Sequence, residues 1–421
     1  MARRVPLGFE PASATIVPGC AASGATAGET SGGTSGETVC LGSRLETDKG
    51  YVVTGRVLIT GGCGFIGRRL AAELLANGYD VRILDSLVEQ VHGPAGSSPL
   101  TEVEVVVGDV RSRETVDRAI SGVDHVVHLA AEVGVGQSMY EIARYVGAND
   151  LGTAVLLEAL LERPPERIVV ASSMSVYGEG AYVDSDGRRH EQVRRRRSDV
   201  SQGRWDPLGP EHRPLRAVPT DERKPVDLAS IYALTKYAQE RQVLIFGEAY
   251  GVEATALRLF NVFGPGQALS NPYTGVLANF ASRIASGQRP LVFEDGEQKR
   301  DFVHVDDVAR AFRLALESPN VGGEVINVGS GNAYSIRWVA EELAAVMGAP
   351  QLAPDILGKS RSGDIRNCFA DITKARELLA FSPRRSLEDS FEEIADWVAG
   401  SEATDNAQRM RRELEVRGLV A

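Results

Sequence analysis

The sequence predicts an α/β protein built on a doubly wound parallel sheet, a Rossmann fold, with a smaller mixed α/β lobe towards the C-terminus. Short apolar strands and amphipathic helices alternate from residue 56 onward. A glycine-rich turn joins the first of these strands to the first helix. After residue 264 the regular alternation gives way to shorter, mixed elements, which suit a smaller lobe.

The first helix is predicted over Phe65–Asn77, where apolar residues recur every three or four positions and Gly78 ends the pattern. The first strand, Arg56–Thr60, precedes it. Two further long helices are expected over Asn149–Leu161 and Ile231–Tyr250. Five more strands are predicted at Val81–Leu84, Val103–Val107, Val123–Leu129, Arg167–Ala171 and Ala254–Leu259.

The predicted strands and helices divide the chain into four segments. Residues 1–53 are expected to be a disordered extension, because Ala21–Thr38 holds almost no large apolar residue. Residues 54–264 form the Rossmann domain, with an inserted excursion at about 180–225 whose Arg194–Arg197 run is expected to be a solvated face. Residues 265–400 form the lobe, although a strand and helix at about 305–330 are expected to return to the sheet. Residues 401–421 form a tail.

The composition excludes several classes of function. The 421 residues are 43% hydrophobic and 24% charged, with a formal net charge of −11. This acidic balance argues against a nucleic-acid partner, since a phosphate backbone requires a basic face. The sequence contains no run of about 18 apolar residues, so no membrane span is predicted. The four cysteines form no C-x-x-C pair, so we expect no metal site, no disulfide framework and a cytoplasmic setting.

A dinucleotide site is predicted where the first strand meets the first helix. Gly62, Gly64 and Gly67 fit the pattern G-x-G-x-x-G, and Gly61 allows a looser fit. Glycines permit a tight turn and a close approach to a pyrophosphate, while the helix N-terminus offers free N–H groups and a positive dipole. The alternative is a purely structural glycine turn.

The ends of the next strands suggest which dinucleotide would bind. Asp85 ends the second strand, where a carboxylate accepts hydrogen bonds from ribose hydroxyls and repels a 2′-phosphate, so NAD is favoured over NADP. An aspartate ending the third strand, Asp109, can meet the adenine. His128, near the end of the fourth strand, is interpreted as a packed core residue, and the small residues after it leave room for a cofactor.

Tyr232 and Lys236 are the candidate acid–base pair. They lie four residues apart, on the same face of the predicted helix. A lysine ammonium beside a phenol is expected to lower the phenol pKa. Ser173 ends the fifth strand, at the sheet edge where ligands of such folds bind, and its hydroxyl can bond a reacting oxygen.

Taken together, the motifs resemble the extended short-chain dehydrogenase/reductases of the NAD-dependent epimerase/dehydratase family over about residues 54–400. The resemblance implies that Ser173, Tyr232 and Lys236 are catalytic. The residues that it and the motifs assign to NAD are Gly61, Gly62, Gly64, Phe65, Ile66, Gly67, Asp85, Asp109, Val110, Leu129, Ala130, Ala131, Asn149, Tyr232, Lys236 and Phe260. Those assigned to a nucleotide-sugar substrate are Ser173, Asn261, Arg300, Arg361 and Asp364.

The type of reaction is indicated by two positions after Ser173. Family members that dehydrate sugars carry an Asp-Glu pair there, whereas this chain has Met174 and Ser175, which cannot act as acid or base near neutral pH. This favours a 4-epimerase over a dehydratase. Segments 133–140, 267–275 and 363–366 resemble the subgroup that acts on dTDP-L-rhamnose, for which the product would be dTDP-6-deoxy-L-talose. UDP-glucose or UDP-glucuronate 4-epimerase, 4-keto-sugar reductase and a non-catalytic NAD-binding regulator remain as alternatives.

A homodimer is also expected, because the two long helices carry apolar residues beyond one stripe and similar enzymes pair these helices into a four-helix bundle. The residues concerned are Val155, Leu156, Leu157, Leu160, Ile231, Leu234, Val243 and Leu244.

Overall fold

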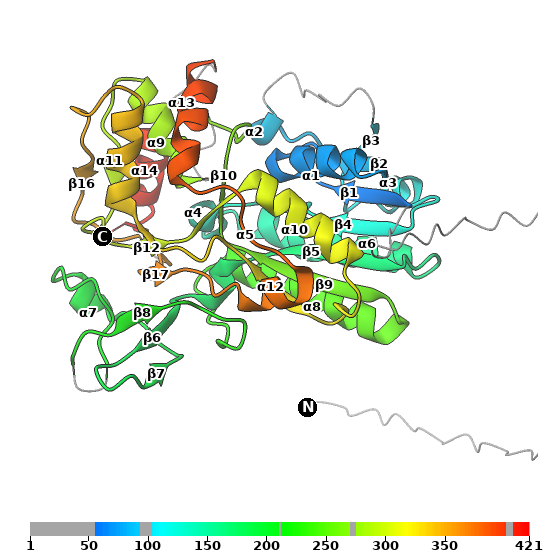
Figure 1. The fold of residues 1–421 in the computed structure, drawn as a ribbon, viewed down its shortest axis with the longest axis horizontal. Coiled ribbons are helices and arrows are strands. Elements are labelled where there is room, and N and C mark those ends of the chain that lie inside the picture. Colours follow the sequence, from blue (N-terminus) through cyan, green and yellow to red (C-terminus); the bar gives the residue numbers. More distant parts are fainter. Residues whose placement is uncertain are drawn as a thin grey trace, which may run out of the picture. The chain divides into compact units, whose positions relative to one another are not determined.

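In the computed structural model, the described residues are 55–92, 103–209, 212–269, 275–361, 363–400 and 407–420. The expected disordered extension over 1–53 lies outside them, as does part of the tail. A seven-stranded parallel sheet runs through the described part in the order β14-β9-β5-β4-β1-β2-β3 (Figure 1). Its strands are β1 (Arg56–Thr60), β2 (Asp80–Asp85), β3 (Glu104–Val107), β4 (His125–His128), β5 (Arg167–Ser173), β9 (Glu253–Leu259) and β14 (Val325–Val328).

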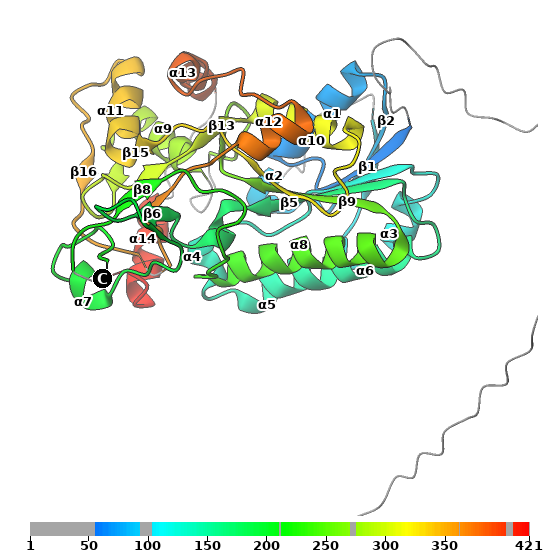
Figure 2. The ribbon, with the colours of Figure 1, turned by 60° about the horizontal axis from the view of Figure 1, so that its bottom comes forward.

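Helices cover both faces of this sheet (Figure 2). Val57 and Ile59 of β1 pack into one apolar cluster and Leu58 into another, since successive strand residues point to opposite faces. The first cluster includes residues of α1 (Phe65–Ala76), α10 (Val305–Glu317) and α12 (Thr373–Leu379). The second includes residues of α3 (Arg113–Ala119), α6 (Gly152–Leu160) and α8 (Ile231–Tyr250). The predicted doubly wound Rossmann fold is therefore confirmed.

Helix α8 has the bounds that the sequence predicts. The Ser230 side chain accepts a hydrogen bond from the backbone N–H of Ala233, and Gly251 ends the helix with a φ of +70°. The other long helix differs from its prediction. It is preceded by α5 (Ile142–Tyr145) and opens with a π-helical turn, Val146–Leu151, which hydropathy does not reveal. No described helix is long and apolar enough to cross a membrane.

The inserted excursion contains a small antiparallel sheet. Its strands are β6 (Ala181–Val183), β7 (Arg189–His190) and β8 (Arg216–Val218), and α7 (Arg197–Val200) begins at the last residue of the arginine run. The expectation that the whole run is solvated is wrong for Arg195, whose side chain is 9% exposed. Its guanidinium pairs with Glu179 and Glu294 at 3.0 and 2.5 Å, so burial is offset by two carboxylates.

The lobe packs three helices around its own apolar cluster: α9 (Val276–Ala285), α11 (Ile336–Val346) and α13 (Phe391–Ala399). Between these helices the chain returns to the Rossmann sheet, where α10 packs on α1 and β14 pairs with β9. Short strands complete the lobe: β10 (Asn261–Phe263), β11 (Leu291–Val292), β12 (Lys299–Arg300), β13 (Phe302–His304), β15 (Tyr334–Ser335), β16 (Asp355–Ile356) and β17 (Asn367–Cys368). The remaining helices are α2 (Glu89–His92), α4 (Val135–Ser138), α14 (Ala407–Val416) and two 3₁₀ turns, Met174–Tyr177 and Glu388–Ser390.

Candidate active site

A cavity of about 840 Å³ opens at the carboxyl ends of the sheet strands and extends into the lobe. Gly61, Asp85, Asp109 and Ser173 line it from the ends of four different strands. In open α/β sheets this edge is where ligands bind. Within the described residues, no group of three or more His, Cys, Asp or Glu side chains could hold a metal ion.

The glycine loop shapes the Rossmann side of the cavity. Gly61 has a φ of +71°, and a Cβ there would lie 2.8 Å from the backbone nitrogen of Ala130. A Cβ on Gly67 would lie 2.5 Å from Cα of Gly62, so the first turn of α1 packs directly on the loop. The N-terminus of α1, at Phe65 and Ile66, lines the cavity and fits the pyrophosphate of a dinucleotide.

Asp85 connects this loop to the end of β2. One carboxylate oxygen accepts a hydrogen bond from the Cys63 N–H at 2.9 Å and the other from the Leu87 N–H at 2.8 Å. The side chain is 7% exposed and forms part of the cavity wall, which fits the role of ribose acceptor. Asp109 also lines the cavity, and its pKa is lowered by the hydrogen bond from Arg111.

Two residues that we expected at the cofactor do not line the cavity. Gly62 lies behind the loop, where a Cβ would come within 2.6 Å of Ile83 Cγ1, so it serves close packing. Asn149 is fully buried in the π-helical turn. Its amide accepts from the Glu132 N–H at 2.7 Å and donates to the Thr235 hydroxyl at 2.9 Å, so it connects the cavity wall to α8.

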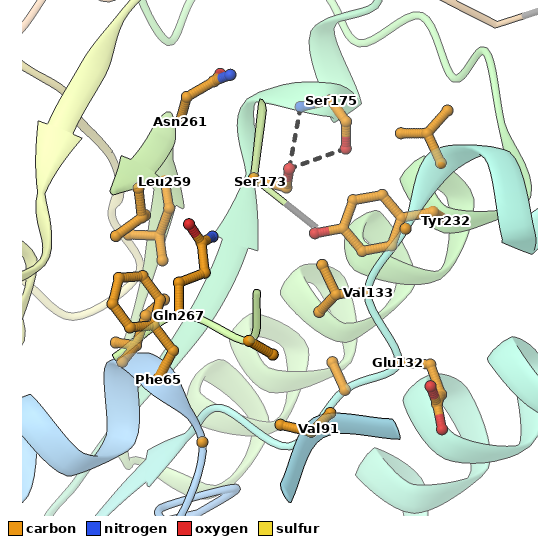
Figure 3. A pocket seen from close by; sticks show the side chains of 18 of the residues that line it. Phe65, Val91, Glu132, Val133, Ser173, Ser175, Tyr232, Leu259, Asn261 and Gln267 are labelled. Atoms are coloured by element: carbon orange, nitrogen blue, oxygen red, sulfur yellow. Dashed lines mark hydrogen bonds between the residues drawn. The ribbon is translucent and has the colours of Figure 1, made fainter. Parts of the chain in front are cut away.

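Ser173 and Tyr232 come together from β5 and the first turn of α8. The Tyr232 hydroxyl points towards Ser173, as Figure 3 shows. Ser175 donates to the Ser173 hydroxyl oxygen twice, from its backbone N–H at 3.2 Å and from its own hydroxyl at 2.9 Å. With those donors in place, the Ser173 proton is available for Tyr232 or for a ligand oxygen.

The electrostatics of this pair differ from the sequence-based expectation. Burial raises the pKa of Tyr232, and only the hydrogen bond with Ser173 lowers it, whereas we expected Lys236 to lower it. Burial also lowers the pKa of Lys236 to about 7, although Glu240 raises it. The Lys236 ammonium donates to the Gln239 side chain at 2.7 Å, so its charge is held on the helix side of the cavity.

Gln239 fixes Lys236 through a buried hydrogen-bond network. The Gln239 amide nitrogen contacts His128 Nε2 at 3.1 Å and donates to the Thr153 hydroxyl at 3.0 Å. His128 also contacts the Thr60 hydroxyl at 2.7 Å and is fully buried, and burial lowers its pKa to about 3. This neutral histidine fits the interpretation of a packed core residue.

The residues expected at the substrate converge on the lobe side. Asn261, Arg300, Arg361 and Asp364 all line the cavity. Asp364 lies between the two arginines, at 3.3 Å from Arg300 and 2.9 Å from Arg361. Burial opposes the charged form of Asp364, but Arg361 and Arg300 outweigh it and lower the carboxyl pKa. The pair of guanidinium groups suits a diphosphate.

Sequence reasoning missed part of the wall because nothing local marks it. Phe293 enters the cavity from a loop of the lobe, and the Arg361 guanidinium stacks 4.5 Å from the centre of its ring. Gln267, which begins one of the segments that resemble the dTDP-L-rhamnose subgroup, also lines the cavity. The tail contributes Arg411, Leu414 and Leu419. Amphipathicity over 407–416 predicts only a surface helix and gives no sign of the cavity.

The fold is of the nucleotide-binding Rossmann class, and Ser173, Tyr232 and Lys236 line one cavity at the edge of its sheet. The model of the family described as "NAD dependent epimerase/dehydratase family" matches residues 57–198 and 208–329. The chain belongs to this family and is an NAD-dependent enzyme.

Three relatives illustrate this family membership. The chain is 36% identical to a dTDP-L-rhamnose 4-epimerase of Burkholderia thailandensis, over 82% of this chain and 95% of that protein. It is 30% identical to a putative UDP-glucose 4-epimerase of Methanocaldococcus jannaschii, over 83% and 100%. A solved UDP-glucose 4-epimerase of Thermus thermophilus in complex with NAD is 28% identical with a TM-score of 0.67, over 82% and 100%.

Proposed function

We propose that this protein is a nucleotide-sugar 4-epimerase and that its substrate is dTDP-L-rhamnose, converted to dTDP-6-deoxy-L-talose. The observation that carries the proposal is the arrangement of Ser173 and Tyr232 in one cavity with Met174 and Ser175 at the positions of an eliminating acid–base pair. Ser175 is occupied by its hydrogen bonds to Ser173. The site can therefore move a proton at one hydroxyl but has no second group there to expel water.

In this reaction Tyr232 accepts the proton of the sugar C4 hydroxyl and returns it after the sugar has turned over. Ser173 donates a hydrogen bond to the same oxygen, and Lys236 in its charged form stabilises the phenolate. When bound, NAD would supply a reversible hydride acceptor for the C4 position. The glycine loop, Asp85 and the end of β4 would hold this cofactor.

The diphosphate would be held by Arg300 and Arg361, with Asp364 keeping both guanidinium groups in place and meeting the ribose. Asn261, at the start of β10, would reach the sugar nucleotide. These groups restrain the nucleotide end of the ligand and leave the hexose attached through a rotatable link. Such an arrangement allows the sugar to present either face to the cofactor.

The choice of sugar is supported by the 36% identity with the Burkholderia thailandensis dTDP-L-rhamnose 4-epimerase. UDP-glucose 4-epimerase is the second candidate, favoured by the 30% identity with the Methanocaldococcus jannaschii protein. A panel of dTDP- and UDP-sugars, incubated with the enzyme without added reductant, separates the two. Conversion of UDP-glucose with no conversion of dTDP-L-rhamnose would reverse the order of the candidates.

Isotope labelling tests the reaction class. With substrate deuterated at C4, we expect the product to keep deuterium at C4 in the opposite configuration, without consumption of NADH and without solvent deuterium on carbon. Because dTDP-L-rhamnose has no C6 hydroxyl to eliminate, the dehydratase alternative is tested with dTDP-glucose deuterated at C4, from which a 4,6-dehydratase moves the label to C6 and exchanges C5 with solvent. A reductase consumes stoichiometric NAD(P)H. Label at C6 or a requirement for reductant would overturn the epimerase proposal. Binding of NAD with no conversion of any sugar would support the non-catalytic alternative.

We also infer that the protein forms a homodimer through α5, α6 and α8. Most of the apolar residues predicted for this interface, such as Leu156 and Val243, are instead buried inside the chain. Of the predicted residues, Leu234 is exposed, and further apolar side chains are exposed on these helices and their ends: Ile142, Val146, Leu151, Leu161, Ile245 and Tyr250. Such an apolar face is typical of a protein interface.

A further inference from the structure

The tail helix α14 lies against the cavity that holds the candidate active site. Arg411 and Leu414 on the helix, and Leu419 just after it, are part of the cavity wall. Figure 2 shows α14 beside α4, which belongs to the Rossmann side. The tail thus adds two apolar side chains and one cation to a wall that is otherwise built from the sheet edge and the lobe.

On the Rossmann side, α14 is anchored to the segment that follows β4. Leu414 is only 2% exposed, and its Cδ2 lies 3.4 Å from the position that a Cβ on Gly136 would take. The Tyr140 hydroxyl donates to the Glu413 carboxylate at 3.2 Å. The Arg417 guanidinium lies 4.1 Å from the centre of the Tyr140 ring.

On the lobe side, the tail is anchored to the segment that carries Arg361. Lys359 pairs with Glu415 at 3.1 Å, and Arg411 holds the same carboxylate from within α14 at 3.0 Å. Val420 forms an antiparallel bridge with Arg361 itself. The tail therefore joins the two walls of the cavity, and its end pairs with a residue that we assign to the diphosphate.

These anchors are unequal in strength. The ion pair between Lys359 and Glu415 has side chains that are 44% and 33% exposed, so solvent screens it and it contributes little. The pair of Arg411 with Glu415 lies within α14 and does not hold the helix to the lobe. Leu414 is the buried contact, and it packs directly beside Gly136. A helix held by one buried leucine and several exposed pairs can leave and return at low cost.

We propose that α14 closes over the bound nucleotide sugar and is a substrate-retaining element of the site. Arg411 supplies a cation for the phosphate-bearing ligand, while Leu414 and Leu419 cover its sugar. The proposal rests on the proposed function, because a 4-epimerase must keep its 4-keto sugar while that sugar turns over. Without closure, the oxidised sugar escapes before the hydride is returned.

A matched pair of substitutions on α14 tests the closure. Leu414→Glu places a charge in the buried contact, whereas Val416→Glu places the same charge on a side chain that is 88% exposed. If Leu414→Glu reduces the closed fraction about tenfold, the apparent KM for the nucleotide sugar rises about tenfold. We expect 4-keto sugar, trapped with hydroxylamine and detected by mass spectrometry, to appear only with Leu414→Glu.

Two further measurements test the closure of α14 by nucleotide affinity and by proteolysis. Arg411→Met preserves the helix and should weaken binding of dTDP and UDP in calorimetry without changing the affinity for NAD. In the wild-type protein, nucleotide sugar should slow tryptic cleavage after the exposed Arg412 and Arg417. If the Leu414→Glu and Val416→Glu proteins are both active and show equal KM and equal release of the 4-keto sugar, the closure proposal is wrong.

A failure of the epimerase assignment can be distinguished from a failure of the closure. If the wild-type protein converts no sugar in the panel, the epimerase assignment fails, and the closure is judged from dTDP and UDP affinity alone. In that case Leu414→Glu must bind these nucleotides more weakly than Val416→Glu does. Equal affinities would reject the closure as well.

Discussion

Tyr232 and Lys236 are four residues apart on α8, and burial shifts the pKa of each towards its neutral form. In the free protein, Tyr232 is therefore a protonated phenol with a hydrogen bond to Ser173. Lys236 loses its ammonium form as the pH rises through about 7, whereas an unperturbed lysine keeps it to about 10. In the proposed reaction, Tyr232 therefore takes the proton of the sugar hydroxyl, whereas Lys236 supplies the charge that stabilises the phenolate.

Removing the phenol oxygen should abolish turnover while leaving the cofactor site intact. Because Tyr232 is the base in the proposed reaction, we expect Tyr232→Phe to lose about 10²–10⁴-fold in kcat. Affinity for NAD, measured by calorimetry, should stay close to that of the wild type. Tyr237→Phe, on the same helix but outside the cavity wall, is the control. Wild-type turnover in Tyr232→Phe would contradict the assignment.

The buried His128 makes stability depend on pH. Its pKa is lowered to about 3 in the folded protein and is about 6.5 when unfolded, so the unfolded state takes up the proton first. The stabilising contribution is complete above pH 6.5 and is lost as the pH falls towards 3. Each pH unit in that window costs about 1.4 kcal/mol of unfolding free energy.

Urea unfolding at several pH values from about 7 down to about 4, a range that begins above the pKa of histidine in the unfolded chain, measures this dependence. His128→Gln keeps a polar group for Thr60 and Thr153 but cannot be protonated, so its unfolding free energy should fall less steeply than that of the wild type. Other titrating groups, including the buried His125, contribute equally to both proteins. Identical slopes would show that His128 does not carry the effect.

At the scale of elements, the excursion is tied to the lobe through Arg195. Besides its pairs with Glu179 and Glu294, Arg195 donates to the backbone carbonyl of Asp364 at 2.8 Å. Asp364 in turn contacts Arg300 and Arg361. The excursion therefore helps to position the group that we assign to the nucleotide ribose and diphosphate.

Breaking this connection should affect stability and substrate binding together. Arg195→Met leaves the fully buried Glu294 with one partner fewer, and loss of a buried partner costs about 3–5 kcal/mol. The neighbouring Arg194→Met removes only a pair whose arginine side chain is 80% exposed, worth about 0–1 kcal/mol. Chemical denaturation and the KM for the nucleotide sugar should both separate the two variants. Equal values would refute a positioning role for Arg195.

At the scale of the whole molecule, the exposed apolar face on α5, α6 and α8 predicts assembly. We expect light scattering to give the mass of a dimer for the wild type. Leu234→Glu, at a side chain that is 45% exposed on α8, should shift the protein towards monomer. Val346→Glu, at a similarly exposed valine in the lobe, is the control and should remain dimeric. A monomeric wild type would contradict the inferred dimer.

The sequence by itself determined the features that depend on local pattern. The order of strands and helices, the glycine loop and the bounds of α8 follow from residue spacing, backbone freedom and capping within a few positions along the chain. The same holds for the spacing of Tyr232 and Lys236, because a helix fixes residues four apart on one face. The glycine loop, Asp85 and the Tyr232–Lys236 pair could be identified in this way, whereas the substrate residues of the lobe were assigned by the resemblance to the family.

Only the tertiary structure decided the features that depend on residues far apart in sequence. Arg195 is buried because Glu179 and Glu294 come from other segments, although its own neighbours suggest a solvated run. The direction in which the Tyr232 pKa moves depends on burial, which spacing alone does not give. The tail reaches the cavity because Leu414 meets Gly136, nearly 280 residues earlier in the chain. Local periodicity records none of these contacts, since each is made by packing between distant segments.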